Sequence, residues 1–273
     1  MTTLLGVIGD PIAHSLSPLI HNYWLRSHGV AAHYEAMQVS AGDLGSALET
    51  LAKRSVRGVN ITLPHKEDAL ALAAQATPLS AKIGAANTLT YNVEAQTWHA
   101  DNTDAPGFLD TLNDLELSDL QGRKVLLLGA GGSARALALA LAQAGAELTI
   151  LNRTQAKAAE LASHCGANAV FGGLDRYHDL QSDQETVIST LSLGHGGEAF
   201  GLGPGEDRLF YDISYGKAAA RQAEAARQAG WRVVDGLPML VAQAARSFAI
   251  WFDIEPERDV ILRRCRKVVE ALA

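Results

Sequence analysis

The sequence predicts an α/β protein with two lobes, an N-terminal α/β lobe and a Rossmann-like lobe, with a cleft between them. Three observations favour this class. Short runs of β-branched residues and leucine alternate with longer, alanine-rich stretches along the chain, an alternation typical of parallel α/β folds. The run KVLLL at 124–128 leads directly into a glycine-rich turn and a helical stretch. A polar turn at 102–106 precedes another helical stretch and a fresh strand, so we expect the lobes to divide there.

The individual elements follow from this alternation. Strands are expected at the short apolar or β-branched runs, which lie at 4–8, 33–39, 58–63, 124–128, 147–151, 185–189, 208–212 and 232–234. Helices are expected at the longer stretches, which lie at 18–27, 44–54, 107–115, 134–144 and 218–228. Two final helical stretches, 240–252 and 258–272, have no strand after them, and we expect them to pack onto the first lobe. The expected domains are therefore 1–104, completed by 237–273, and 105–236.

Composition and charge narrow the class of partner. Of the 273 residues, 48% are hydrophobic and 19% are charged, the balance of a globular protein. The formal net charge of -7 argues against nucleic-acid binding, which needs a dense basic surface. Cys165 and Cys265 show no metal-site spacing, and uncharged runs such as 136–146 are far shorter than the roughly 20 residues that cross a membrane. We expect a cytoplasmic monomer or homodimer that acts on a small molecule and binds neither nucleic acid nor membrane.

The turn after 124–128 predicts a dinucleotide site. Glycines there allow a tight turn and a close approach of the backbone to a pyrophosphate, and the start of the next helix supplies N–H groups and a positive dipole end. The complete order of strand, turn and helix makes a turn that serves packing alone the weaker alternative. The residues expected to contact the cofactor are Gly129, Ala130, Gly131, Gly132 and Ser133.

The end of the next strand favours NADP over NAD. NAD enzymes carry an acidic residue there for the ribose 2′-hydroxyl, whereas this chain has Asn152, Arg153 and Thr154, with Lys157 one turn on. No carboxylate repels a 2′-phosphate, and the Arg153 guanidinium can pair with one. In the alternative interpretation Arg153 and Lys157 form a solvated face and Thr154 caps a helix.

Polar residues in the first lobe predict where a substrate binds. Ser17, before Pro18, is expected to cap a helix, while Ser15 has no such structural role, and the two hydroxyls together could hold a carboxylate. Asn60 and Thr62 lie in an otherwise apolar strand, and Lys66 follows it closely. If a helix begins there, its dipole disfavours the ammonium and favours release of a proton; a surface lysine paired with a neighbouring carboxylate is the alternative.

Two further segments, GAANTLTYN and ADNTDAPGF, supply Asn87 and Asp104. A carboxylate near Lys66 would hold its ammonium in place and accept a hydrogen bond from a substrate hydroxyl. In the alternative, Asp104 is the N-cap of the next helix. The sequence itself does not show whether Lys66 and Asp104 meet.

Together the segments GDPIAHSLSP, GVNITLPHKE, AANT, DNTD, GAGGSAR, NRT and GLPMLVAQAA resemble, in their order, the motifs of the shikimate dehydrogenase family. The resemblance implies two α/β lobes, with NADP held in the second. It implies reversible NADPH-dependent reduction of 3-dehydroshikimate to shikimate, a step of aromatic amino-acid biosynthesis, without a metal. Two alternatives remain: a quinate/shikimate dehydrogenase with broader substrate use, and a non-catalytic NADP-binding regulator on the same scaffold.

The resemblance also assigns roles to residues. Lys66 becomes the catalytic acid/base, with Asp104 orienting lysine and substrate. Ser15 and Ser17 become ligands of the carboxylate, and the partners of the ring hydroxyls are Thr62, Asn87 and Asp104. Substrate would also contact Tyr215 and Gln243, the nicotinamide would contact Ile213 and Gly236, and the adenosine phosphate would contact Asn152, Arg153, Thr154 and Lys157. The chain departs from the family's usual pattern at Ala105, Pro106, Ser189 and Pro238.

Overall fold

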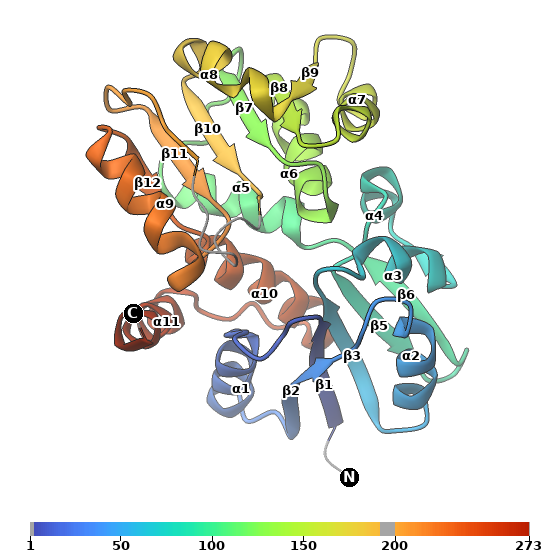
Figure 1. The fold of residues 1–273 in the computed structure, drawn as a ribbon. Coiled ribbons are helices and arrows are strands. Elements are labelled where there is room, and N and C mark those ends of the chain that lie inside the picture. The colour runs from blue at the N-terminus through green and yellow to red at the C-terminus, as the bar shows by residue number, and fades with distance from the viewer. Residues whose placement is uncertain (1–2, 192–199, 273) are drawn as a thin grey trace. The chain divides into compact units, whose positions relative to one another are not determined.

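The computed structural model describes residues 3–191 and 200–272, and these form two compact units (Figure 1). The first unit combines the chain up to Gly107 with residues 240–265, and the second contains residues 108–239. The residues from Arg266 on group with the second unit, whereas the sequence analysis placed them with the first. The predicted α/β class is confirmed, because each unit is a sheet with helices packed on it.

The sheet of the first unit is mixed. Its strands lie in the order β2-β1-β3-β5-β6-β4, with bounds β1 Thr3–Gly9, β2 Ala32–Gln38, β3 Val56–Ile61, β4 Gln75–Ala76, β5 Thr88–Asn92 and β6 Thr97–Asp101. The strands β1, β2 and β3 are parallel, but β5 runs antiparallel to both β3 and β6. The sequence analysis missed β4, β5 and β6 because these segments lack the apolar run of a buried parallel strand.

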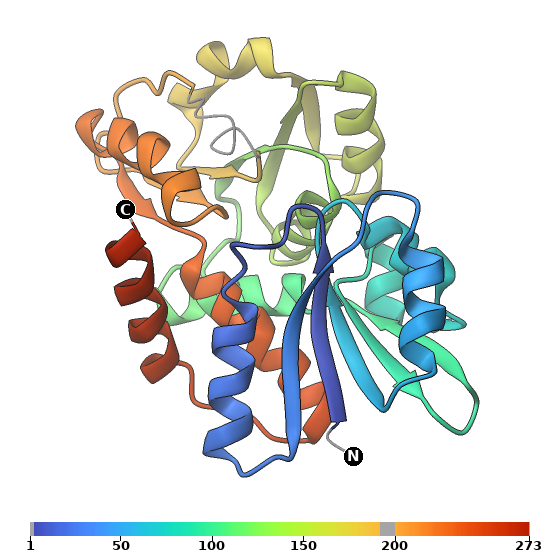
Figure 2. The ribbon, with the colours of Figure 1, turned by 60° about the horizontal axis from the view of Figure 1, so that its bottom comes forward.

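Helices cover both faces of this sheet. One face packs its apolar side chains against α2 (Leu44–Ala52) and α3 (Lys66–Leu72). On the other face α1 (Ser17–Ser27) lies beside α10 (Leu237–Phe252), as Figures 1 and 2 show. Aromatic side chains join these two helices, since Trp24 packs edge-on against Phe248 with ring centroids 5.7 Å apart. The remaining helices that begin in this unit are α4 (Pro78–Ile83), α5 (Asp104–Asp114) and α11 (Asp259–Leu272).

The second unit contains a fully parallel sheet, as predicted. Its order is β12-β11-β10-β7-β8-β9, with bounds β7 Lys124–Leu128, β8 Glu147–Asn152, β9 Val170–Gly173, β10 Thr186–Ser189, β11 Leu209–Asp212 and β12 Arg232–Val234. The central strand β7 is buried from Val125 to Leu128, which explains its continuous apolar sequence. The helices are α6 (Gly132–Gln143), α7 (Gln155–His164), α8 (Tyr177–Leu180) and α9 (Lys217–Gln228), with short 3-10 turns at Leu174–Arg176 and Gln181–Asp183.

The described residues contain neither a membrane-spanning helix nor a group of side chains that could hold a metal ion. None of their helices is long and apolar enough to cross a membrane. Within the same residues, no three His, Cys, Asp or Glu side chains are grouped so that they could hold a metal ion.

Candidate active site

A buried ion pair joins Lys66 to Asp104. The Lys66 Nζ lies 2.6 Å from Asp104 Oδ2, and the two side chains are only 12% and 6% exposed. Lys66 is the first residue of α3, a helix start that the sequence analysis considered only as a condition, and Asp104 is the first residue of α5. The Lys66 carbonyl accepts a hydrogen bond from the Ala86 N–H at 2.8 Å, so the start of α3 is tied to the segment that carries Asn87. The structure therefore brings together two groups that lie 38 residues apart in the chain.

Asp104 is not the helix cap that the alternative interpretation required. The capping group is the Asn102 side chain, whose Oδ1 accepts the N–H groups of Asp104 at 3.1 Å and Ala105 at 3.3 Å. Asn102 is itself anchored, because its Nδ2 donates to the Ala85 carbonyl at 2.9 Å. The Asp104 carboxylate instead contacts Lys66 and Asn87.

Asn87 organises the polar groups around this pair. Its Nδ2 donates to Asp104 Oδ1 at 2.8 Å and to Gln243 Oε1 at 3.2 Å, and its Oδ1 accepts the Thr103 N–H at 2.7 Å. The Gln243 amide is oriented by donation from its Nε2 to the Leu240 carbonyl at 2.8 Å. Asn87 is 2% exposed, so the cost of burying its amide is offset by these hydrogen bonds.

The approach of α5 to α10 depends on a glycine that the sequence analysis did not single out. A Cβ at Gly107 would lie 2.6 Å from the Gln243 backbone nitrogen, too close for any other residue. Asn102, Thr103 and Thr88 were also missed as members of the network. The DNTD motif contains Asn102 and Thr103, but only the structure shows that Thr103 contacts Asn87 and that Asn102 accepts the first N–H groups of α5.

The two serines lie at the start of α1 and differ from expectation. Ser17 is the first residue of α1, and the position before it, Leu16, makes no side-chain cap bond, so the prediction of a Ser17 cap is wrong. Instead Ser15 Oγ accepts the Ser17 backbone N–H at 3.2 Å, which gives Ser15 the structural role it was thought to lack. Ser17 is 4% exposed and Ser15 is half-buried.

Thr62 follows β3, and its backbone joins two of the loops that carry predicted site residues. Its N–H donates to the Ile8 carbonyl at 2.9 Å, and its carbonyl accepts the His65 N–H at 3.0 Å. The second of these bonds forms the turn that leads into Lys66. The Thr62 side chain is half-buried, and its methyl group lies against Gly9, where a Cβ would collide with it.

The predicted dinucleotide turn connects β7 to α6 in the second unit. Gly129 adopts a φ of +112°, and a Cβ there would overlap Thr190 Oγ1. Gly131 precedes α6 and has nothing within 4 Å of where a Cβ would stand, so open space faces the start of this helix. Gly132 and Ser133 open α6, and the start of a helix carries the positive end of its dipole. These features fit a pyrophosphate.

The segment after β8 presents its side chains to solvent. Arg153 and Lys157 are exposed, and Asn152 donates from its Nδ2 to the Thr154 carbonyl at 3.0 Å. Thr154 occupies the N-cap position of α7 but makes no side-chain cap bond, so its hydroxyl is not used as the structural alternative proposed. No acidic residue lies between 152 and 157.

Ile213 and Gly236 meet through their backbones within the second unit. A Cβ on Gly236 would overlap the Ile213 carbonyl, and the Gly236 N–H donates to the Ser214 carbonyl at 2.9 Å. The loop after β11, which also carries Tyr215, is therefore tied to the segment that leads into α10. Asp212 at the end of β11 supports this loop by accepting the Ser214 N–H at 2.9 Å, and burial raises the pKa of the Asp212 carboxyl.

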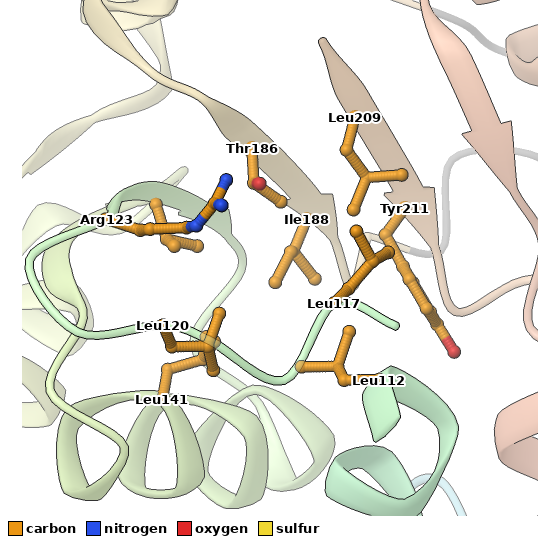
Figure 3. A pocket seen from close by; sticks show the side chains of 10 residues that line it. Leu112, Leu117, Leu120, Arg123, Leu141, Thr186, Ile188, Leu209 and Tyr211 are labelled. Atoms are coloured by element: carbon orange, nitrogen blue, oxygen red, sulfur yellow. The ribbon is translucent and has the colours of Figure 1, made fainter. Parts of the chain in front are cut away.

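A small cavity in the second unit is separate from all of these residues. It has a volume of about 20 Å³, and Figure 3 shows leucine side chains pointing into it, with Arg123 at its edge. Its other lining groups come from β7, β10 and β11. None of the predicted site residues lines it, and we assign it to imperfect packing of the core.

Family models and curated relatives match most of the chain. Residues 7–89 match the model of the shikimate dehydrogenase substrate binding domain, 111–195 that of shikimate / quinate 5-dehydrogenase, and 236–266 that of the shikimate 5′-dehydrogenase C-terminal domain. The shikimate dehydrogenase (NADP(+)) of Hyphomonas neptunium is 51% identical over 273 residues, covering 99% of both chains. That of Jannaschia sp. is 40% identical over 268 residues, covering 95% of both.

Solved structures of shikimate dehydrogenases also resemble the chain over nearly its whole length. Shikimate dehydrogenase from Aquifex aeolicus superposes with a TM-score of 0.87 at 32% identity, covering 97% of this chain and 98% of that one. Shikimate 5-dehydrogenase from Thermus thermophilus, in complex with NADP(H) and shikimate, gives a TM-score of 0.81 at 32% identity, covering 97% and 99%. With the buried Lys66–Asp104 pair and the glycine turn in place, these similarities show that the chain belongs to the shikimate dehydrogenase family.

Proposed function

We propose that the chain catalyses the reversible NADPH-dependent reduction of 3-dehydroshikimate to shikimate. The observation that carries this proposal is the buried pair of Lys66 and Asp104, held by Asn87. The two curated relatives of the chain that are named above are NADP(+) shikimate dehydrogenases. Retention of both members of the pair disfavours a regulator that binds NADP without catalysis.

We assign the proton transfer to Lys66. A Lys66 ammonium proton passes to the substrate oxygen as the ketone becomes an alkoxide, and in the reverse direction the amine takes it back. Asp104 fixes the position of Nζ through the 2.6 Å contact and accepts a hydrogen bond from a substrate hydroxyl. Asn87 holds the other carboxylate oxygen at 2.8 Å, so Asp104 is oriented before substrate arrives.

The remaining polar groups of the first unit would bind the rest of the substrate. We assign Ser15 and Ser17 to the carboxylate and Thr62, Asn87 and Gln243 to hydroxyl groups of the ring. Tyr215 of the second unit completes the proposed set. We accordingly propose that the first unit binds the substrate and the second binds the nucleotide.

The second unit would hold NADP, which when bound supplies or accepts the hydride. The pyrophosphate would lie against Gly129, Ala130, Gly131, Gly132 and Ser133, where the open space at Gly131 and the start of α6 fit it. The 2′-phosphate would pair with Arg153, with Lys157, Asn152 and Thr154 close by in sequence. Ile213 and Gly236 would border the nicotinamide. We further propose that the protein works in the cytoplasm as a monomer or homodimer.

Initial rates with two substrates and two cofactors test this function. We expect oxidation of shikimate with NADP to be far faster than with NAD, and faster than oxidation of quinate with either cofactor. Comparable rates with quinate would move the assignment to a quinate/shikimate dehydrogenase. Absence of turnover with all four pairs would refute the proposal and favour the non-catalytic regulator.

A further inference from the structure

Thr88 occupies a fully buried position beside Asn87, yet it carries a hydroxyl group. It is the first residue of β5 and is 0% exposed. Valine has the same shape and also suits a strand, and a buried hydroxyl costs free energy unless it is hydrogen-bonded. Because no part of Thr88 reaches solvent, its hydroxyl can affect the reaction only through a neighbour.

The Thr88 hydroxyl receives a hydrogen bond from the opposite strand. Asn60 and Thr88 are paired in the antiparallel ladder of β3 and β5, and Asn60 Nδ2 donates to Thr88 Oγ1 at 3.1 Å. The Asn60 amide is fixed at both ends, because its nitrogen also donates to the Asn87 carbonyl at 3.3 Å and its oxygen accepts the Tyr34 hydroxyl at 2.8 Å. Tyr34 is held in turn by its ring, which stacks on His21 with centroids 4.2 Å apart.

The proton of the Thr88 hydroxyl goes to Asn87. Thr88 Oγ1 donates to Asn87 Oδ1 at 3.1 Å, and the same oxygen accepts the Thr103 N–H at 2.7 Å. The Thr103 hydroxyl, 3.2 Å from that of Thr88, has its own donor, since Asn87 Nδ2 lies 2.9 Å from it. With its oxygen held on this side, Asn87 presents its nitrogen to Asp104 Oδ1, 2.8 Å away.

The orientation of the Asn87 amide decides whether Asp104 is stabilised or repelled. The two orientations of an asparagine amide fill nearly the same space, so the surrounding donors and acceptors choose between them. Turned by half a rotation, the amide would place its oxygen against the Asp104 carboxylate and its N–H groups against the Thr103 N–H. The donors around Asn87 Oδ1 therefore act on Asp104 through Asn87.

We propose that Thr88 is a positioning residue, whose hydroxyl holds the Asn87 amide in the orientation that serves Asp104 and the substrate. The proposal rests on the proposed function, in which Asn87 orients Asp104 and contacts a ring hydroxyl. Each residue donates to the next, from Tyr34 through Asn60, Thr88 and Asn87 to Asp104. Hydrogen bonds aligned in this way polarise and strengthen one another.

The test compares two pairs of proteins that differ mainly in the hydroxyl, the wild type with Thr88→Val and Thr88→Ser with Thr88→Ala. In each pair we expect loss of the hydroxyl to raise KM for shikimate about 5-fold, the effect of roughly one hydrogen bond, with KM for NADP unchanged. KM is the informative quantity, because a loss of folded protein lowers the rate without changing KM. Thr90→Val is the matched control: Thr90 lies two residues along β5, is half-buried and takes no part in these bonds.

Three results would overturn the role of Thr88 while leaving the proposed function intact. One is an unchanged KM for shikimate in the two hydroxyl-free variants. Another is an increase in Thr88→Ser as large as in Thr88→Ala, or in Thr90→Val as large as in Thr88→Val. The third is that both hydroxyl-free variants fail to fold while Thr88→Ser folds, which would show that the hydroxyl serves the fold.

Side-chain amide resonances test the contact without any turnover of shikimate. In isotope-labelled protein, the Asn87 side-chain amide protons should exchange with solvent faster in Thr88→Val than in the wild type or Thr88→Ser. The backbone N–H of Ile61, which donates to the Asn87 carbonyl at 2.8 Å, reports any general opening of the sheet and should exchange at the same rate in all three. Equal exchange of the Asn87 amide in all three proteins would refute the positioning role, whether or not the wild type oxidises shikimate.

Discussion

A lysine ammonium that is 12% exposed has lost most of its hydration, and a partner must offset that loss. Asp104 does so for Lys66, and Asn87 in turn satisfies the second carboxylate oxygen. Removal of one member leaves the other buried and uncompensated. At the scale of single residues, the site is therefore a set of groups that each depend on the next.

Lys66→Ala should abolish most of the turnover while leaving KM for shikimate within a few-fold. The reason is that general acid–base catalysis contributes about 10²- to 10⁴-fold to the rate, whereas binding rests on other side chains. Steady-state kinetics with shikimate and NADP measures both parameters. Lys82→Ala, which removes an exposed lysine of α4, is the control and should behave as wild type. A Lys66→Ala variant with undiminished kcat would exclude the acid/base role.

Arg153→Ala should raise KM for NADP by about 10-fold and leave KM for NAD nearly unchanged, because a charge-assisted pair with the 2′-phosphate contributes roughly 1.5–3 kcal/mol. NAD lacks that phosphate. The control is Arg232→Ala, at the start of β12 and also exposed to solvent. Equal increases for both cofactors would contradict the assignment of Arg153 to the 2′-phosphate.

At the scale of elements, substitutions of Gly129 and Gly131 test how the turn between β7 and α6 contributes to stability and to cofactor binding. Gly129→Ala forces a side chain onto a φ of +112° and onto Thr190, so we expect the free energy of unfolding to fall by about 1–3 kcal/mol. Gly131→Ala meets open space and should keep wild-type stability but raise KM for NADP, since its methyl group would occupy the place that we propose for the pyrophosphate. Thermal melts and NADP kinetics separate the two effects, and a stable Gly129→Ala variant would refute the first.

The first turn of α5 supplies a second test at this scale. Asn102→Ala removes the acceptor for the N–H groups of Asp104 and Ala105, which should cost about 1 kcal/mol of stability. Because Asp104 opens the same turn, kcat should fall as well. Asp43 directly precedes α2 but makes no side-chain cap bond, so Asp43→Ala should change neither quantity. Full activity in Asn102→Ala would show that Asp104 is positioned without its helix cap.

At the scale of the whole molecule, stability should depend on pH through His21. Burial lowers the pKa of His21 to about 3 from an ordinary value of 6.5. The unfolded chain therefore binds a proton between these values that the folded chain does not, and stability falls as the pH drops below about 6.5, by about 1.4 kcal/mol per pH unit. Above that pH this contribution is fully present.

Urea unfolding between pH 5 and 7.5 measures this dependence. Tryptophan fluorescence suits it, because Trp24, Trp98 and Trp251 all lie in the first unit with His21. His21→Phe keeps an aromatic ring against Tyr34 but cannot take up a proton, so its stability should fall less steeply toward pH 5. Identical slopes in the two proteins would show that His21 does not set the acid sensitivity.

The sequence by itself determined those features that depend on neighbours along the chain. The strand, glycine turn and helix at 124–143 are local patterns, and the structure has them where they were predicted. The missing carboxylate at Asn152 is likewise a property of the sequence alone. A helix start at Lys66 was left open by the sequence, and the structure has one there. The order of the motifs was also enough to indicate the family.

Tertiary structure alone decided which polar groups meet. Asn102, rather than Asp104 or Ser17, proved to be a helix cap, and Ser15 supports the Ser17 backbone. The antiparallel pairing of β5 with β3 and the bond from Tyr34 to Asn60 join residues that lie 26 or more positions apart in the chain. Such contacts depend on how distant segments pack, and a hydroxyl or amide has several possible partners until packing leaves only one within reach.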